Sequence, residues 1–339
     1  MYSGKAVYWE GKNKLKEGEI IISDLGEDQA LIEVKYCGIC GTDLAIYKGI
    51  HPRVKMHLIL GHEFSGVIKY IKGSSLREGD KVVANPLISC GNCNPCKSGY
   101  SYICQNLKLI GIDRNGAFSK YVVVDKDKLY KIPDGLNLKT ASLIEPFAVG
   151  AHAERVACPK KRDIVVILGG GPIGIAAGLF FKDSGVENIY FSEISNYRLE
   201  VLKKFKFNVI NPTKENLRDK IKKISGGKLA DIVIEATGAC GSVFTMVSLA
   251  KIRGLIILLG ISHKHPVVDF MNVVFKELTI RGVRVYSDED FSSAIDFVIN
   301  NKEKLKDYIS EIFKLDELKK ALTYADDSTK SMKVVVEIT

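Results

Sequence analysis

The sequence predicts a chain of two domains, one rich in β-strands and one of α/β type with a doubly wound parallel sheet. Its 339 residues suit roughly two domains. Short β-prone runs occupy the first third, and beyond Thr140 apolar strands alternate with helical segments. Apolar residues make up 46% and charged residues 26% of the chain, a balance that excludes a disordered tail or a small disulfide scaffold.

The β-rich part begins with strands predicted over residues 30–36, 64–70 and 81–84. Clusters of Gly, Asp and Ser separate these runs, as expected of turns. The spacing indicates a compact, partly closed β unit.

The α/β part begins with a helix predicted over residues 141–156 and an apolar strand over 164–168. Later strands are predicted at 189–191, 231–234 and 255–259. Strands that are apolar on both faces and separated by helices indicate a parallel sheet covered on both sides. The last fifty residues predict helices near 290–302 and 315–323 and a final strand over 333–337.

Charge and hydrophobicity restrict the location and the partners. The net charge of +9 suggests acidic partners such as nucleic acid, phosphorylated metabolites or anionic lipid. The first residues lack the pattern of a signal peptide, and the most apolar stretch, 254–261, is too short to span a bilayer. We therefore expect a cytoplasmic protein without a membrane partner, in which clustered cysteines hold metal more often than they form disulfides.

A glycine-rich turn follows the strand at 164–168 and precedes a helical run. It has the pattern G-x-G-x-x-G and reads Gly169-Gly170-Gly171-Pro172-Ile173-Gly174. The glycines allow a tight turn, close approach of a pyrophosphate and close packing of helix on strand. Glu193 ends the second strand, where an acidic residue binds the adenosine ribose and repels a 2′-phosphate, which favours NAD over NADP. Arg198 is predicted to flank the adenosine.

Four cysteines lie in one short loop. They are Cys90, Cys93, Cys96 and Cys104. Four thiolates at this spacing predict a closed, structural zinc site. The alternative is two disulfides or four unrelated thiols. A zinc module that binds nucleic acid is not expected, because the loop carries few basic residues beyond Lys97.

A second candidate metal set is spread along the chain. Cys37-Gly-Ile-Cys40 is followed by Gly61-His62-Glu63, and Glu145-Pro146 lies at the predicted domain boundary. One thiolate, one imidazole and one carboxylate would leave an open fourth position, as catalytic zinc requires. The alternatives are a buried core histidine for His62 and a small buried hydrophobe for Cys37.

Taken in order, these segments resemble the zinc-containing medium-chain dehydrogenases over nearly the whole chain. The matching motifs are Gly-Ile-Cys-Gly-Thr-Asp, Gly-His-Glu-Phe-Ser-Gly, the four-cysteine loop, Glu-Pro-Phe-Ala-Val-Gly and Gly-Gly-Gly-Pro-Ile-Gly. Glu145-Pro146 is more similar to the polyol branch (sorbitol, threonine and butanediol dehydrogenases) than to the ethanol branch. The resemblance implies a GroES-like zinc catalytic domain from residues 1–145 and 286–339 and a Rossmann NAD-binding domain from 146–285.

The resemblance also implies roles for single residues. Cys40 and His62 match zinc ligands of the family, Glu145 matches the third ligand, and Glu63 matches a carboxylate that can replace it. Thr42 matches the hydroxyl that contacts the substrate oxygen. Lys333 matches a basic residue that approaches the pyrophosphate. Ala45 stands where many members have a histidine at the end of the proton relay, so the proton must leave by another route.

The implied reaction is the reversible oxidation of a secondary alcohol to a ketone. One zinc ion is catalytic and one structural, and NAD⁺ accepts the hydride from a small alcohol or polyol. The alternatives are a zinc-dependent aldehyde or ketone reductase and a non-catalytic scaffold that binds NAD and zinc. Residues 278–283 resemble the family's edge strand for dimer pairing, and we expect a homo-oligomer, either a dimer or a tetramer.

Overall fold

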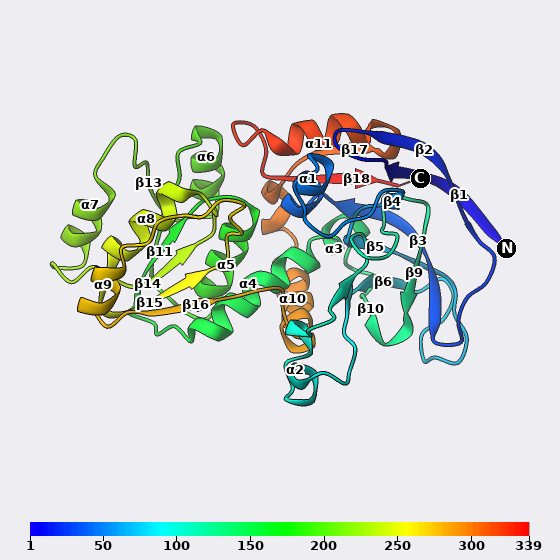
Figure 1. Cartoon of the computed structure of the whole chain (residues 1–339), viewed down its shortest axis with the longest axis horizontal. Helices are drawn as coiled ribbons and strands as arrows, with labels where there is room; N and C mark the ends of the chain where they lie inside the picture. The colour runs from blue at the N-terminus through cyan, green and yellow to red at the C-terminus, as the bar shows by residue number, and fades with distance from the viewer. Residues whose placement is uncertain (339) are drawn as a thin grey trace. The chain divides into compact units, whose positions relative to one another are not determined.

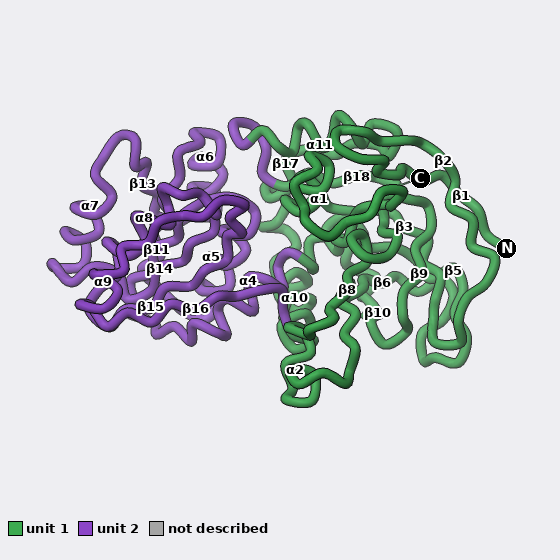
Figure 2. The backbone as a smooth tube through the Cα atoms, viewed as in Figure 1, with its two compact units in different colours: residues 1–145, 287–327, 333–339 green, residues 146–286, 328–332 purple. Residues whose placement is uncertain are grey.

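The computed structural model describes residues 1–338 and divides the chain into two compact units (Figures 1 and 2). Unit 1 contains Met1–Glu145, Ser287–Asp327 and the segment from Lys333 onward. Unit 2 contains Pro146–Tyr286 and Ser328–Met332. The segment Ser328–Met332, which was predicted with the β-rich domain, thus groups with unit 2.

Unit 1 is built on a sheet of seven strands in the order β10-β6-β5-β3-β18-β17, with β9 also paired to β3. A smaller sheet has the order β2-β1-β4, and β7 pairs with β8. The strands are β1 (Tyr2–Trp9), β2 (Leu15–Ile22), β3 (Gln29–Gly38), β4 (Leu58–Ile59), β5 (Glu63–Tyr70), β6 (Lys81–Ala84), β7 (Leu87–Ile88), β8 (Lys108–Leu109), β9 (Tyr121–Asp125), β10 (Leu129–Lys131), β17 (Ile309–Lys314) and β18 (Lys333–Glu337). The helices are α1 (Gly41–Tyr47), α2 (Asn94–Lys97), α3 (Leu138–Ala141), α10 (Asp288–Asn301) and α11 (Leu318–Asp326).

The centre of this sheet brings distant parts of the sequence together. β3 lies between β5 and β18 and is antiparallel to both. Gly38, the last residue of β3, is paired with Glu63 on one side and with Val335 on the other. The strand β18 therefore lies at the same end of the sheet as the Cys37–Cys40 and His62–Glu63 segments.

Unit 2 is a parallel sheet of six strands in the order β13-β12-β11-β14-β15-β16 (Figure 1). The strands are β11 (Ile164–Leu168), β12 (Asn188–Ser192), β13 (Asn208–Ile210), β14 (Ala230–Glu235), β15 (Ala250–Leu258) and β16 (Thr279–Gly282). The helices are α4 (Ile144–Ala157), which begins at the boundary of the units, α5 (Pro172–Asp183), α6 (Asn196–Lys204), α7 (Leu217–Ile224), α8 (Cys240–Leu249) and α9 (Phe270–Phe275). This confirms the predicted doubly wound sheet.

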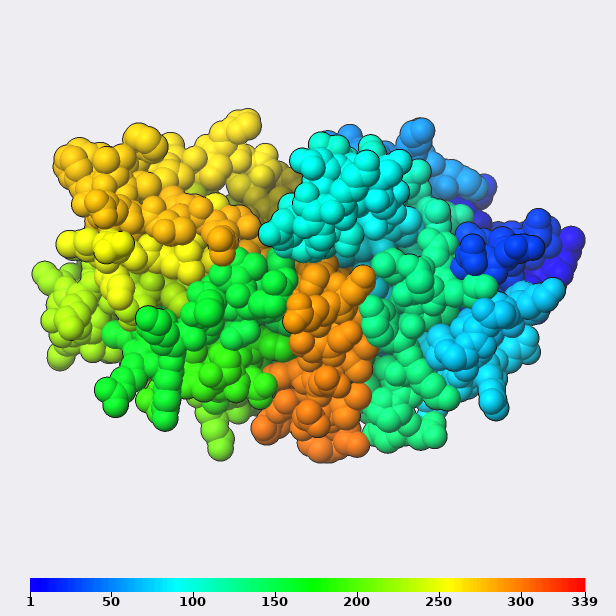
Figure 3. All heavy atoms as spheres, turned by 90° about the horizontal axis from the view of Figure 1, so that it is seen from below, coloured from blue at the N-terminus to red at the C-terminus, as the bar shows by residue number. Residues whose placement is uncertain are grey.

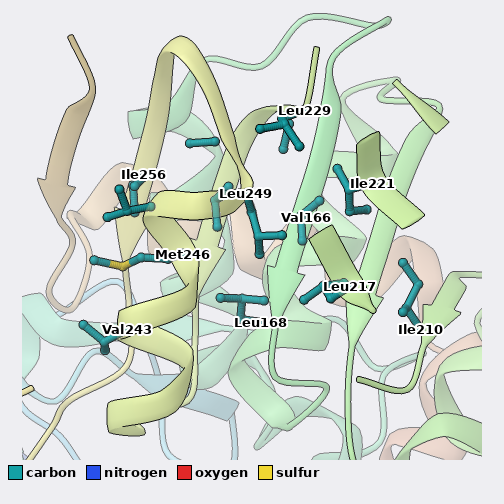
Figure 4. Close-up of a cluster of buried hydrophobic side chains, with 14 residues drawn as sticks. Val166, Leu168, Ile210, Leu217, Ile221, Leu229, Val243, Met246, Leu249 and Ile256 are labelled. Carbon is teal, nitrogen blue, oxygen red and sulfur yellow. The ribbon is translucent and has the colours of Figure 1, made fainter. Parts of the chain in front are cut away.

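The core of unit 2 follows from the alternation of side chains along β11. Val166 and Leu168 pack with residues of α7 and α8 in one buried cluster (Figure 4). Ile167 points to the opposite face, where it meets Gly178 of α5. Both faces of the strand are thus buried, as its continuous apolar sequence predicted.

The helix predicted over residues 141–156 is α4 (Ile144–Ala157), which begins three residues later than predicted, and the separate short helix α3 ends at Ala141. Pro146 has no N–H to donate to the carbonyl of Ser142, so one continuous helix cannot form through this segment. Proline is tolerated in the first turn, where α4 places it. None of the helices within residues 1–338 has the length and apolarity that crossing a membrane requires.

Candidate metal centres and dinucleotide site

Helix α1 presents the first candidate ligand. Cys40 is its N-cap residue, and Asp43 in the first turn accepts a hydrogen bond from the Cys40 N–H at 2.9 Å. The motif Cys-x-x-Asp thus works as a capping box, with a thiol in place of the usual hydroxyl. The cap fixes the backbone that carries the Cys40 thiol.

Cys40, His62 and Glu63 come together at one end of the central strands β3 and β5. Each offers one ligand atom, and these three atoms lie within 4.8 Å of one another. His62 and Glu63 are buried, and Cys40 is half-buried. A thiolate, an imidazole and a carboxylate at this separation fit a zinc ion, which binds sulfur, nitrogen and oxygen donors at about 2.0–2.3 Å.

Asp43 is a buried residue of this cluster that the sequence did not single out as a site residue. It is fully buried, its Oδ1 accepts a hydrogen bond from the Gly61 N–H at 3.2 Å, and the same oxygen lies 3.8 Å from His62 Nδ1. Metal-binding histidines often donate their second ring N–H to a carboxylate, and here the Asp43–His62 separation is longer than a hydrogen bond. The capping-box spacing after Cys40 was the available signal.

The electrostatics of this cluster favour a cation. Burial alone would lower the pKa of His62, but the negative charges of Asp43, Cys40 and Glu145 outweigh it and raise that pKa well above its usual value. Burial raises the pKa of Asp43. Negative groups thus gather around His62, where a positive ion would be stabilised.

Lys333 lies against this cluster. Its Nζ forms a fully buried ion pair with Glu63 and donates a hydrogen bond to the Ile39 carbonyl at 2.9 Å. Gly38 makes room for the pair, because a Cβ there would overlap the Glu63 carboxylate and lie 3.0 Å from Lys333 Cε. The predicted contact of Lys333 with a pyrophosphate stays a prediction.

The remaining predicted residues of this site lie nearby in unit 1. Glu145 is buried at the start of α4, close enough for its charge to act on His62, but outside the compact group of three ligand atoms. Thr42 is half-buried in the first turn of α1. Cys37 is fully buried, and its Sγ lies 2.8 Å from the position of a Cβ on Gly61, which agrees with a packing role.

The four-cysteine loop forms the second metal group. The sulfur atoms of Cys90, Cys93, Cys96 and Cys104 lie within 4.8 Å of one another, and three of the pairs are 3.4, 3.7 and 3.4 Å apart. A disulfide would require about 2.05 Å. A tetrahedron with Zn–S bonds of about 2.3 Å has edges near 3.8 Å, so the arrangement fits zinc.

The backbone of the loop favours thiolate at one of these positions. Hydrogen bonds from the N–H groups of Asn92 and Cys93 lower the pKa of Cys90 to about 6. The Cys104 sulfur also accepts hydrogen bonds at 3.3 Å from the N–H groups of Cys90 and Asn106. Such bonds stabilise the negative sulfur that zinc binds.

In unit 2 the glycine-rich turn joins β11 to α5. Gly169 has φ +100°, a conformation that other residues rarely adopt. A Cβ on Gly174 would overlap the carbonyl oxygen of Gly169, so the third glycine is required for the helix to pack here. Gly171 is the N-cap of α5 and offers no capping side chain, which leaves first-turn N–H groups for an anion. Pro172 and Ile173 form that first turn.

Glu193 lies beside this turn and is buried. Its Oε2 accepts a hydrogen bond from the Gly170 N–H at 2.8 Å, and its Oε1 accepts from the N–H groups of Ile194 and Ser195 at 2.7 and 2.8 Å. A carboxylate has about four lone-pair sites, so one remains for a ribose hydroxyl. The position fits the predicted role, which stays a prediction.

Arg198 also lies beside the glycine-rich turn. Its Nη1 is 3.3 Å from the position of a Cβ on Gly171, and its Nε donates to the Ser331 carbonyl at 3.2 Å. Burial lowers the pKa of Arg198 and the charge of Glu193 opposes that effect. The turn, a helix N-terminus, a carboxylate and a guanidinium together fit a dinucleotide.

Comparison with known proteins agrees with both sites. Residues 26–134 match the family model for the alcohol dehydrogenase GroES-like domain, and residues 172–312 match the model for zinc-binding dehydrogenase. The chain is 36% identical over 324 residues to a 2-dehydro-3-deoxy-L-galactonate 5-dehydrogenase of Pseudoalteromonas atlantica, covering 95% of this chain and 94% of that one. It is 30% identical over 339 residues to an L-threonine 3-dehydrogenase of Shigella sonnei, covering 96% and 98%.

Two solved structures share the fold over almost the whole chain. A zinc-binding dehydrogenase of Sinorhizobium meliloti 1021 bound to NADP matches with a TM-score of 0.93 and 27% identity, covering 99% of this chain and 100% of that one. An alcohol dehydrogenase of Escherichia coli CFT073 in complex with NADH matches with a TM-score of 0.90 and 29% identity, at the same coverage.

Proposed function

The chain belongs to the zinc-containing medium-chain alcohol and polyol dehydrogenases, and we propose that it oxidises a hydroxyl group of a polyol or sugar acid with the residues described above. It is a zinc-dependent oxidoreductase that transfers a hydride from a secondary alcohol to NAD⁺, reversibly giving the ketone. The observation that carries the assignment of the reacting site is the convergence of Cys40, His62 and Glu63 at one point.

In this proposal Cys40 and His62 hold the catalytic zinc, and the carboxylate of Glu63 or Glu145 completes its protein ligands. The ion supplies a Lewis acid that lowers the pKa of the substrate hydroxyl. Asp43 would position the first ligand through the Cys40 N–H, and its carboxylate lies 3.8 Å from His62 Nδ1.

In this proposal the hydroxyl of Thr42 relays the substrate proton: as it takes that proton, it gives its own to solvent water. Thr42 follows Cys40 by two residues, and the capped first turn of α1 holds both. Holding a reacting hydroxyl and a metal ligand on one rigid turn lowers the entropic part of the activation barrier. The glycine-rich turn would hold NAD⁺, with Glu193 at the adenosine ribose and Arg198 beside it, and the cofactor would supply the hydride acceptor.

The four-cysteine loop has a separate role. Its sulfur atoms fill all four positions of a tetrahedral ion and leave none for substrate. The loop around α2 buries little apolar surface, and its short helix has no buried residue. Zinc there stabilises the fold of the loop.

The substrate class rests on the relatives. The 36% identical relative is a dehydrogenase of 2-dehydro-3-deoxy-L-galactonate, a polyhydroxy acid, and other relatives act on L-threonine. Zinc-loaded protein should therefore form NADH, followed at 340 nm, with members of a panel of polyols, sugar acids, sugar-alcohol phosphates, diols and L-threonine. Turnover of simple primary alcohols alone would contradict the proposed class.

We also propose that the enzyme is a homo-oligomer. β16 is an edge strand whose four residues are all exposed. The neighbouring α9 exposes Phe270, Met271, Val274 and Phe275, and Figure 3 shows this segment, coloured yellow to orange, at the surface. An open strand edge beside apolar side chains suits pairing with a second copy. Light scattering should give a dimer or tetramer, and Phe275→Asp should shift it toward monomer.

A cytoplasmic location is the last part of the proposal. All eight cysteines are free thiols, and four of them gather at one metal group. This use of cysteine is typical of a reducing compartment.

A further inference from the structure

The carboxyl edge of the unit 2 sheet has a second buried carboxylate, Glu235. From β11 the chain adds β12 and β13 on one side of the sheet and β14, β15 and β16 on the other (Figure 1). Ligands of such sheets bind where the strand order reverses, at the carboxyl ends of the strands. β11 ends in the glycine-rich turn, β12 leads to Glu193, and Glu235 ends β14, opposite Leu168.

The Glu235 side chain is 1% exposed, and it accepts hydrogen bonds from the residues that follow it in the chain. Its Oε1 accepts hydrogen bonds from the Thr237 N–H at 3.0 Å and from the Thr237 hydroxyl. Its Oε2 accepts from the Gly238 N–H at 3.0 Å. Glu235 forms no ion pair within residues 1–338, so its carboxylate is held by these neutral donors alone.

The bonds to Glu235 fix the direction of Thr237. The Thr237 hydroxyl donates to Glu235 and accepts from the Ala239 N–H at 2.9 Å. The Thr237 methyl carbon then lies 2.6 Å from the position of a Cβ on Gly169, so it packs directly on the first glycine of the turn. Glu235 therefore determines, through Thr237, the surface that borders the glycine-rich turn on the β14 side.

Glu235 also fixes the turn after β15. Its carbonyl oxygen accepts hydrogen bonds from the N–H groups of Leu259 and Gly260 at 2.8 and 2.9 Å. A Cβ on Gly260 would lie 2.5 Å from Glu235 Oε2. One residue thus holds two of the turns at the carboxyl ends of the strands, where sheets of this kind bind dinucleotides.

We propose that Glu235 is a positioning residue for the dinucleotide. It holds Thr237 against Gly169 and so shapes the β14 side of the glycine-rich turn, as Glu193 holds the β12 side through Gly170. This inference rests on the proposed binding of NAD to the glycine-rich turn. It assigns to Glu235 no contact with the reacting atoms.

The test compares NADH binding by Glu235→Gln and by a matched control, each as the full-length, zinc-loaded protein. Glutamine keeps the shape and one acceptor oxygen but loses the other, so the Gly238 N–H, which donates to both oxygens at 3.2 and 3.0 Å, retains only one acceptor. The control is Asp231→Asn, at the other end of β14, where Asp231 accepts from the Ile164 N–H at 2.8 Å and pairs with Lys251. Each variant replaces a hydrogen-bonded carboxylate of β14 with an amide, but only Glu235 lies at the end of the strand where the cofactor is proposed to bind.

NADH affinity is measured by fluorescence titration and stability by thermal unfolding. Glu235→Gln should raise the dissociation constant of NADH about tenfold, the effect of losing a hydrogen bond to a charged group. Asp231→Asn should leave that constant unchanged. An unchanged constant in Glu235→Gln, or equal weakening in both variants, overturns the proposal.

A second variant keeps the test decisive if Glu235→Gln does not fold. Thr237→Val retains the branched shape but removes the hydroxyl that Glu235 orients, and it should raise the dissociation constant of NADH roughly threefold to tenfold. In the double variant the two effects should not add, because they act through one contact; additive effects count against the proposal. If the wild-type protein itself binds no NADH, the proposed function has failed, and this inference fails with it.

Discussion

The backbone N–H of Gly170 donates to the carboxylate of Glu193 at 2.8 Å. The second glycine of the turn is thereby fixed to the residue that ends the neighbouring strand. Glu193 thus orders the glycine-rich turn, and in the proposed function the same carboxylate also sets the choice between NAD and NADP.

Replacing Glu193 should therefore change cofactor preference. Glu193→Ser removes the negative charge that repels a 2′-phosphate, and we expect the ratio of kcat/KM for NADP⁺ to that for NAD⁺ to rise about tenfold or more. Glu200→Ser, on the exposed face of α6, is the control and should leave the ratio unchanged. A constant ratio in Glu193→Ser would remove Glu193 from its assigned role.

Asp43 should control the affinity for the catalytic zinc. Asp43→Asn keeps one acceptor oxygen but removes the charge beside His62, and comparable changes around metal ligands cost about 10–100-fold in affinity. We expect chelator titration to remove one zinc ion more readily than from the wild type. Equal resistance of both ions to the chelator in the variant and the wild type would show that Asp43 has no such role.

The four-cysteine loop should contribute to stability rather than to chemistry. Cys93→Ser removes one of four ligands, and we expect loss of one zinc ion and a fall in Tm of roughly 5 °C or more. Cys158→Ser, an exposed thiol outside the loop, should change neither quantity. Full zinc content and an unchanged Tm in Cys93→Ser would contradict a structural zinc site.

Stability should fall in alkaline solution, partly through Tyr130. Burial, followed by the charge on Asp288, raises the pKa of Tyr130 to about 12 from an ordinary value of 10.0. The folded state therefore keeps the phenol proton where the unfolded chain has lost it, so this contribution is complete below pH 10 and disappears as pH rises toward 12. Tyr130→Phe retains the ring contact with Phe291 and should make the loss of Tm over this interval shallower. An identical pH profile would contradict it.

Local patterns predicted the parts of the molecule that local physics determines. The strands predicted over residues 164–168 and 333–337 coincide with β11 and β18. Short runs rich in Val and Ile between turn residues are typical of buried strands. The grouping of the four cysteines followed from their short spacing, which brings the sulfur atoms together in almost any compact loop.

Contacts that depend on register between distant segments could not be predicted in this way. The Lys333–Glu63 ion pair forms because only β3 lies between β5 and β18 in the sheet. This strand order cannot be read from the distance between the two residues in the sequence. Glu235 showed no sequence pattern as a site residue, since its role follows from the turns that fold back onto it. Asp43 could be recognised in the sequence only as part of a motif. Its hydrogen bond from the Gly61 N–H depends on the fold, which brings Gly61 next to α1.

The central claim is that zinc at Cys40 and His62 carries the reaction, while the dinucleotide binds independently in unit 2. Its most direct test is to measure zinc content, NADH affinity and turnover together in Cys40→Ser. The account predicts one zinc ion per chain in place of two, an NADH dissociation constant like that of the wild type, and no detectable turnover. Normal turnover with NAD⁺, or two zinc ions retained in the variant, would contradict it.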